Sequence, residues 1–256
     1  GMISNHYDFV ANNQPAWHAH RARRTEHGVV KRLLLEWARL NGAGTVRCVV
    51  DLACGRGGDL YKTYLTMGPC TRYIGVDVSG ESIRELERRA TEMNASIETQ
   101  VHDAATAKLP AAQADLVVMN FALHYFADTE QHMDALMANV ASTLKPGCLF
   151  VGTCVDHRQL GRISVGQRQH GVLMQPPGTD GLRDSAWGRQ YHFMLEGCVD
   201  APESMVHWPS VLKVAHRHGL RPVRFRGFNG FMRSLGATPT CPEENLVYAI
   251  FALRRI

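Results

Sequence analysis

The fold of this chain can be inferred from the stretch VVDLACGRGGDL, Val49 to Leu60. It begins with two β-branched residues, passes through an acid into a turn with three glycines, and leads into a helical pattern. Glycine has no Cβ, so a turn of this kind lets the backbone approach a bound molecule closely. In doubly wound α/β sheets such turns stand at the carboxyl end of the first strand, where ligands bind. The stretch therefore predicts an α/β fold with a ligand site at this turn.

The spacing of the glycines limits the choice of ligand. Turns of this kind usually hold a nucleoside triphosphate, a dinucleotide or S-adenosylmethionine. A P-loop requires Lys-Ser or Lys-Thr after the glycines, and neither follows here. A dinucleotide fingerprint that starts at Gly55 needs glycine where the chain has Leu60, and one that starts at Ala53 lacks its first glycine. Triphosphate binding of the P-loop type is therefore rejected and the dinucleotide pattern fits poorly, which leaves a D-x-A-C-G-x-G-G turn.

Strand-like and helical segments alternate around the turn. The strand-like runs from Arg47 onward are VRCVVDL, RYIGVDV, SIETQVHD, ADLVVMNF and GCLFVGT, with helices expected near 58–66, 80–93 and 129–143. A helix over about 15–40 precedes them, and its expected buried stripe is Leu33, Leu34, Trp37 and Leu40. A helix near 208–218 and strands near 221–227 and 245–253 follow. This alternation predicts a doubly wound, mostly parallel sheet with helices on both faces.

The chain is interpreted as a single domain over residues 2–256. Gly1 before Met2 resembles the remnant of an expression tag, and the domain is compatible with being part of a longer polypeptide. The alternation of strand-like and helical segments is interrupted near 160–190, where QPPGTDGLRD predicts an insertion that serves as a substrate element. We expect the α/β pattern to resume with QYHFMLEG, which begins at Gln190.

Composition excludes several classes of protein. With 45% hydrophobic and 20% charged residues, the 256-residue chain is expected to fold and to be soluble. No apolar run reaches the roughly 20 residues of a membrane span. The seven cysteines are scattered without a C-x-x-C pair, which predicts a reducing compartment and no zinc knuckle. The net charge is +4, and the basic segments HAHRARR, LRPVRFRGF and LRRI suit a phosphate-rich partner, although charge alone favours solvated faces.

Three acids end successive predicted strands: Asp51, Asp77 and Asp103. Asp77 can accept hydrogen bonds from ribose hydroxyls, and Asp103 can accept one from an adenine amino group. Taken singly, each acid is more often a helix N-cap or loop residue. Together on one edge they resemble the set in Rossmann-like S-adenosylmethionine-dependent methyltransferases, and LKPGCLFVGT is similar to the turn into their fifth strand. The resemblance implies a seven-stranded sheet of that type.

Further motifs narrow the resemblance to the mRNA cap guanine-N7 methyltransferases of eukaryotes and viruses. The matching segments follow the order of that family over most of the chain: NHYD, Lys31, DLACGRGGDL, NFALHYF (Asn120–Phe126), QYHFMLEGCVDAPE (Gln190–Glu203), WPSVLKVAHRHGL and VYAIFAL. The resemblance implies methyl transfer from S-adenosylmethionine to N7 of the guanine cap of mRNA. The products are then m7GpppN-RNA and S-adenosylhomocysteine.

The resemblance also implies site residues. For S-adenosylmethionine they are Lys31 (methionine carboxylate), Ala53 and Gly55 (backbone contacts), Asp77 (ribose), Asp103 (adenine), Asn120 and Tyr125. For the mRNA cap they are Arg24 and Arg56 (phosphates), His27, His124, Tyr125, Glu196 and Tyr248. The chain departs from the family at Ala53, where glycine is frequent, and at His27, where the family tends to have asparagine.

The residues implied for the mRNA cap make chemical sense. The ring of Tyr125 can stack on a purine while His124 hydrogen-bonds its edge. Glu196 can accept from both N1–H and the N2 amino group of guanine, a pair of donors that adenine lacks. Tyr248 can close the pocket from the last strand. Each has a structural alternative: a buried His-Tyr pair, an edge-strand salt bridge and a packing tyrosine.

The expected mechanism is one of positioning. Guanine N7 has an available lone pair at neutral pH, so neither a general base nor a metal is expected, and catalysis depends on holding N7, methyl carbon and sulfur in line. Two alternatives stay open: a small-molecule methyltransferase on the same fold, and a non-catalytic RNA-binding pseudo-methyltransferase subunit. The expected partners are 5′-capped mRNA and the guanylyltransferase and triphosphatase components of capping, with no membrane. The expected compartment is the nucleus, or the cytoplasm for a viral protein.

Overall fold

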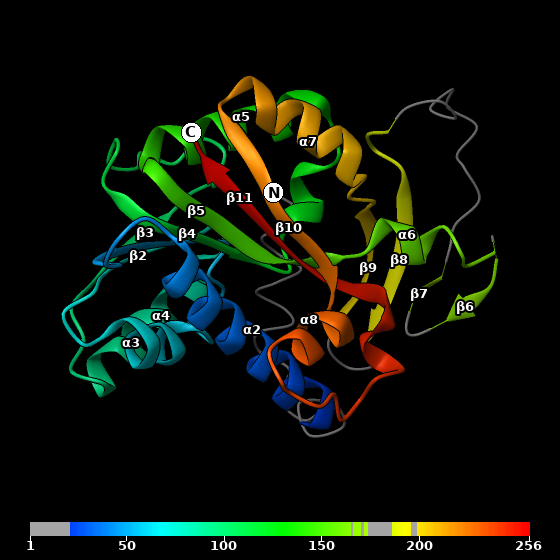
Figure 1. Ribbon diagram of the computed structural model, residues 1–256, viewed down its shortest axis with the longest axis horizontal. Coiled ribbons are helices and arrows are strands. Elements are labelled where there is room, and N and C mark those ends of the chain that lie inside the picture. The colour runs from blue at the N-terminus through cyan, green and yellow to red at the C-terminus, as the bar shows by residue number, and fades with distance from the viewer. Residues whose placement is uncertain (1–20, 165, 170–171, 174–185, 196–198) are drawn as a thin grey trace.

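The computed structural model describes residues 21–164, 166–169, 172–173, 186–195 and 199–256 (Figure 1). Its main sheet has seven strands in the order β10-β11-β5-β4-β1-β2-β3. Their bounds are β1 Cys48–Leu52, β2 Arg72–Asp77, β3 Ile97–Val101, β4 Ala114–Asn120, β5 Leu144–Val155, β10 Leu220–Gly227 and β11 Tyr248–Arg255. The strands from β1 to β5 pair in parallel, whereas β11 pairs antiparallel with both β5 and β10. The predicted doubly wound, mostly parallel seven-stranded sheet is confirmed.

Helices cover both faces of the main sheet (Figure 1). On one face lie α5 (Glu130–Thr143) and α7 (Trp208–Arg217), and on the other lie α2 (Arg21–Asn41), α3 (Leu60–Met67) and α4 (Gly80–Glu92). Short segments complete the carboxyl edge: η2 (Leu123–Phe126), α6 (His157–Leu160), α8 (Phe228–Ser234) and η4 (Glu244–Val247). Among the described helices, none combines the length and the hydropathy that a membrane span requires.

The N-terminal helix, expected over about 15–40, is α2, and residues 15–20 lie outside the described ranges. Its buried face carries Val30, Leu34 and Trp37. The predicted stripe is wrong at Leu40, which is 71% exposed. Each three-residue step falls about 60° short of a full helical turn, so the direction of Leu40 differs from that of Leu34 by about 120°.

The described part of residues 160–190 contributes strands to a second, antiparallel sheet in the order β6-β7-β8-β9. The predicted substrate element QPPGTDGLRD, residues 175–184, lies outside the described residues. The strands of the second sheet are β6 Arg168–Gln169, β7 Val172–Leu173, β8 Gln190–Leu195 and β9 Val199–Ser204. The expectation that QYHFMLEG resumes the α/β pattern of the main sheet is therefore wrong. Its residues Gln190–Leu195 form β8 of the second sheet. Buried Tyr191 and Phe193 alternate with half-buried His192 and Met194, which is typical of an antiparallel strand with one packed face. Strand β9 contacts η2, so the second sheet adds a wall to the carboxyl edge of the main sheet.

The opposite, amino edge of the main sheet is held by a buried carboxylate. Asp115, near the start of β4, is 6% exposed. It accepts hydrogen bonds from the backbone N–H groups of Arg47 and Cys48, both at 2.9 Å, and from Nζ of Lys145 at 2.6 Å. Asp115 thus joins the beginnings of β1, β4 and β5 at the edge that lies away from the glycine turn.

Candidate functional site

The glycine turn adopts left-handed backbone conformations. Ala53, Gly55 and Gly57 have φ angles of 53°, 53° and 71°, a region that glycine enters easily and alanine only with strain. A Cβ at Gly57 would lie 2.5 Å from Cδ1 of Leu86, so the absence of a side chain lets α4 pack this closely. A Cβ at Gly55 would meet no described atom within 4 Å. The turn therefore presents bare backbone beside open space that a ligand can fill.

The acids predicted at the ends of β2 and β3 lie on the same edge as this turn. The Asp77 carboxylate accepts hydrogen bonds from the backbone N–H groups of Gly55 and Ser79, both at 2.8 Å. These two bonds fix Asp77 between the glycine turn and the start of α4. Asp103 follows β3, and its side chain is 42% exposed. The structure thus places a rigid acceptor at the turn and an accessible one farther along the edge.

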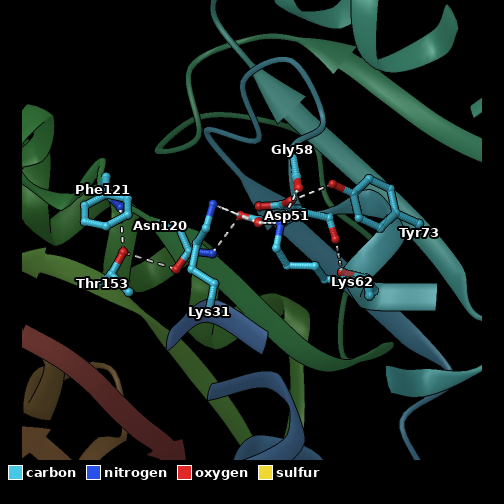
Figure 2. A network of polar contacts seen from close by, with 10 residues as sticks. Lys31, Asp51, Gly58, Lys62, Tyr73, Asn120, Phe121 and Thr153 are labelled. Carbon is cyan, nitrogen blue, oxygen red and sulfur yellow. Dashed lines mark hydrogen bonds and ion pairs between the residues drawn. The ribbon is translucent and has the colours of Figure 1, made fainter. Parts of the chain in front are cut away.

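A polar network joins α2 to the end of the glycine turn (Figure 2). Nζ of Lys31 donates to Oδ2 of Asp59 at 2.8 Å, and Nδ2 of Asn120 donates to the same oxygen at 3.1 Å. Nζ of Lys62 donates to Oδ1 at 3.0 Å. Burial raises the pKa of Asp59, but the two lysines lower it more, so the carboxyl is charged. Two ammonium groups against one carboxylate leave an excess positive charge, which suits an anionic group of a ligand.

The amide of Asn120 is oriented by the neighbouring strand (Figure 2). Oγ1 of Thr153, in β5, donates to Oδ1 of Asn120 at 3.2 Å and accepts from the backbone N–H of Phe121 at 3.1 Å. Phe121 has a φ of 54°, an uncommon conformation for an aromatic residue. The end of β4 is therefore sharply turned, with Asn120 directed to Asp59 and Phe121 to the aromatic rings described below.

Asp51, the first of the strand-end acids, is buried beneath the turn, with only 3% of its surface exposed. Its Oδ2 accepts a hydrogen bond from the Tyr73 hydroxyl at 2.5 Å (Figure 2). Burial, together with the nearby Asp59 carboxylate, raises the pKa of Asp51 to about 7. Asp51 therefore supports the turn from the interior, whereas Asp77 and Asp103 lie at the open edge.

A second group of side chains lies where η2 meets the second sheet. Nε2 of His124 is 3.5 Å from Oε1 of Glu203, and the Tyr191 hydroxyl donates to Oε2 of Glu203. His124 is 4% exposed and Glu203 7% exposed. Burial lowers the pKa of His124, which keeps the imidazole neutral at physiological pH. Among the described residues, neither ring nitrogen of His124 has a hydrogen-bond partner, so the ring offers a buried donor and acceptor beside a carboxylate.

An aromatic cluster adjoins α2 at the same edge. The ring of His27 lies 4.7 Å from Tyr248, 5.2 Å from Phe121 and 5.4 Å from Phe228, measured between centroids. Tyr248 begins β11 and is 4% exposed. We refer to His27, Phe121, Phe228 and Tyr248 as the aromatic cluster. Its flat aromatic rings are of the kind that contact a planar base.

The remaining predicted residues are placed less fully. Arg56 lies in the glycine turn and is partly buried. Tyr125 follows His124 in η2, with their ring centroids 3.9 Å apart. Arg24 lies in α2, but its side chain is outside the described part of the chain, and Glu196 lies outside it altogether. The roles given to Arg24 and Glu196 stay predictions.

Several site residues were not among those predicted: Asp59, Phe121, Tyr191, Glu203 and Phe228. Four of them stand inside the quoted motifs. Asp59 is the acid of GGDL, Phe121 belongs to NFALHYF, and both Tyr191 and Glu203 belong to QYHFMLEGCVDAPE. The available signal was an acid or an aromatic ring within a motif already singled out.

Relatives of this chain share one description. A family model for the mRNA (guanine-N(7))-methyltransferase domain matches residues 22–239. The mRNA cap guanine-N(7) methyltransferase of Drosophila melanogaster is 29% identical over 208 residues, which cover 72% of this chain and 48% of that protein. The protein of the same name in Eremothecium gossypii is 26% identical over an alignment of 267 positions, and the match covers 90% of this chain and 59% of that protein. The chain spans about half the length of the curated relatives it matches.

Solved structures that resemble this one show the fold. The CcbJ methyltransferase of Streptomyces caelestis superposes with a TM-score of 0.62 at 17% identity, covering 90% of this chain and 96% of that one. The geranyl diphosphate C-methyltransferase of Streptomyces coelicolor, solved with S-adenosyl-L-homocysteine, gives 0.58 at 17% identity, covering 91% and 80%. Because the family model matches most of the sequence, this chain belongs to the mRNA (guanine-N(7))-methyltransferase domain family.

Proposed function

We propose that this chain transfers a methyl group from S-adenosylmethionine to N7 of the guanine cap of mRNA. The observation that carries the proposal is the buried pair of His124 and Glu203. The Watson–Crick edge of guanine presents one acceptor, O6, followed by two donors, N1–H and the N2 amino group. A neutral imidazole can donate to O6 while the adjacent carboxylate accepts from both donors. Adenine presents a donor at its N6 amino group and an acceptor at N1, the reverse of O6 and N1–H in guanine, so this pair selects guanine.

The residues at the carboxyl edge fit S-adenosylmethionine. The open space beside Gly55 gives a ligand close access to the backbone, and Asp77 is fixed next to it as an acceptor for ribose hydroxyls. The excess positive charge of Lys31 and Lys62 over Asp59 suits the methionine carboxylate. Asp103 is accessible to the adenine amino group. When bound, the cofactor supplies a methyl group on an already activated sulfonium.

The protein's side chains then contribute to methyl transfer by positioning the base and by stabilising its charge. Guanine N7 needs no deprotonation, so the residues have to hold the base in line with the methyl group and exclude water. The base becomes positively charged as it accepts the methyl group. The Glu203 carboxylate favours that charge, and His124 does not oppose it because burial lowers its pKa and leaves it neutral. The aromatic cluster supplies flat surfaces against which a purine can rest.

Glu196, predicted as the guanine-reading acceptor, and Glu203 are alternatives for one role. Support for Glu203 comes from its contacts with His124 and Tyr191. Methyl transfer by Glu203→Gln and Glu196→Gln variants separates the two assignments. Capped mRNA as partner, an association with guanylyltransferase or triphosphatase components, and a nuclear location remain proposals drawn from the family resemblance.

The proposal is tested by radiolabelled methyl transfer from S-adenosylmethionine to a short GpppA-capped RNA. Uncapped RNA of the same sequence is the control for methylation elsewhere in the RNA. We expect incorporation into the capped RNA only, and removal of the label together with the cap by a decapping nuclease. No incorporation into capped RNA, with binding of the cofactor intact, would refute the proposal and favour a non-catalytic subunit.

A further inference from the structure

Glu26 is a buried carboxylate on α2, 3% exposed, that the chemistry described above does not use. It accepts hydrogen bonds from the backbone N–H of Thr240 at 2.7 Å, from the Thr240 hydroxyl at 2.9 Å and from the backbone N–H of Cys241 at 2.5 Å. Burial raises the pKa of Glu26, but the bonds from Thr240 and Cys241 lower it below its usual value. A charged carboxylate with three donors makes a strong link between these segments.

The segment held by Glu26 connects two parts of the aromatic cluster. Residues 235–243 run from the end of α8, which begins with Phe228, to η4, which leads directly into Tyr248. Nδ2 of Asn229 donates to the carbonyl oxygen of Pro242 at 2.7 Å, so the segment is also bonded to α8. Glu26 therefore holds the piece of chain that places both Phe228 and Tyr248.

On α2, Glu26 is followed at once by His27. Successive helical residues point about 100° apart, so the carboxylate and the imidazole reach different parts of the neighbouring chain. The carboxylate binds the 235–243 segment, and the ring packs on Tyr248 at 4.7 Å and Phe228 at 5.4 Å. Farther along the same helix, Lys31 binds Asp59 in the cofactor half of the site.

We infer that Glu26 is a positioning residue for the aromatic cluster, against which the guanine base rests in the proposed function. Its hydrogen bonds to Thr240 and Cys241 fix the distance between α2 and the segment before β11, and thereby hold the His27 ring in the aromatic cluster. The Lys31 network is a separate attachment of α2, and none of its hydrogen bonds involves Glu26. The inference rests on the proposed function for the identity of the base.

The experiment compares Glu26→Gln with a variant that loses an equally buried carboxylate far from the site. Asp115→Asn is that control, because Asp115 is 6% exposed and also accepts from two backbone N–H groups, at the amino edge. A milder variant, Thr240→Val, removes only the hydroxyl donor to Glu26. Each protein is assayed for thermal stability, for S-adenosylmethionine affinity by calorimetry, and for KM and kcat on GpppA-capped RNA.

We expect both carboxylate variants to lose stability, but only Glu26→Gln to raise the KM for capped RNA, by about tenfold, with cofactor affinity within about twofold of wild type. Thr240→Val should raise KM in the same direction by less. An unchanged KM in Glu26→Gln, or an equal rise in Asp115→Asn, overturns the inference and leaves the proposed function standing. A wild-type chain that methylates no cap overturns both.

Discussion

Nε2 of His124 lies 3.5 Å from Oε1 of Glu203, although His124 follows a strand of the main sheet and Glu203 lies in β9 of the second sheet. Each sheet thus supplies one of the two side chains that we propose to hydrogen-bond the guanine base. Tyr191 donates to Glu203 from β8, directly across the strand pair, so the second sheet also orients the carboxylate. The predictions below begin from this pair.

Replacing Glu203 with glutamine should lower methyl transfer to GpppA-capped RNA by at least about tenfold, or about 1.4 kcal/mol of transition-state stabilisation. Glutamine keeps the size but turns one acceptor into a donor and removes the charge that favours the methylated base. Cofactor binding should not change. Asp200→Asn, on the exposed face of the same strand, is the matched control and should behave as wild type. Reduced methyl transfer by Glu196→Gln, together with normal turnover by Glu203→Gln, would reassign the role to Glu196.

Replacing Asp77 with asparagine should weaken S-adenosylmethionine binding by at least about tenfold. Asparagine would turn an NH2 group towards one of the backbone N–H groups of Gly55 and Ser79, and it offers ribose a weaker acceptor. Calorimetric titration of the purified chain measures the change, with Asp200→Asn again as the control. Equal affinity in wild type and Asp77→Asn would remove Asp77 from the cofactor site.

The KM for capped RNA should rise several-fold between about 50 and 200 mM salt, because binding of a phosphate chain to basic side chains releases counterions. The affinity for S-adenosylmethionine should change much less, since its contacts involve few charges. Steady-state kinetics at several salt concentrations, with parallel calorimetry, test the difference. If both quantities respond equally, the basic segments do not carry the RNA.

The buried Asp51 predicts a pH dependence of stability with a definite sign. Its pKa is about 7 in the folded chain against an ordinary 3.8, so the folded state binds more protons than the unfolded state between these values. Its contribution to stability is complete below about pH 4 and is lost as the pH rises to about 7. In urea unfolding, the stability of Asp51→Asn relative to wild type should therefore increase as the pH rises over that interval. A constant difference between the two proteins from pH 4 to 8 would contradict the assignment.

Tyr73→Phe offers an independent check on the same group. The Tyr73 hydroxyl hydrogen bond lowers the pKa of Asp51 against the effects of burial and Asp59. Removing that donor should extend the pH-dependent loss of stability to higher pH. A variant that is merely destabilised, with the wild-type pH profile, would show that the hydroxyl does not act through Asp51.

The sequence allowed the main sheet and part of the site to be predicted because both follow from local patterns. Parallel strands end at one edge, so acids such as Asp77 and Asp103 at successive strand ends had to share it. The pairing of Lys31 with Asp59 depends instead on how α2 crosses the glycine turn, which no local pattern specifies. Glu203 was missed for the same reason. In sequence, its strand resembles one more strand of the alternating α/β pattern. Only the packing of a second sheet against the main sheet brings Glu203 to His124.

The position of β11 has a consequence for the order in which the site can form. Strand β11 comes last among the strands along the chain, yet it lies between β5 and β10 and pairs with both. A nascent chain synthesised as far as β5 already contains the glycine turn, Asp77 and the Lys31 network. It lacks Tyr248 and the segment that Glu26 binds, so the base-binding wall is completed only after β11 has left the ribosome. Until then β5 and β10 each present an unpaired edge, and an unpaired strand edge is a site at which incomplete chains can associate.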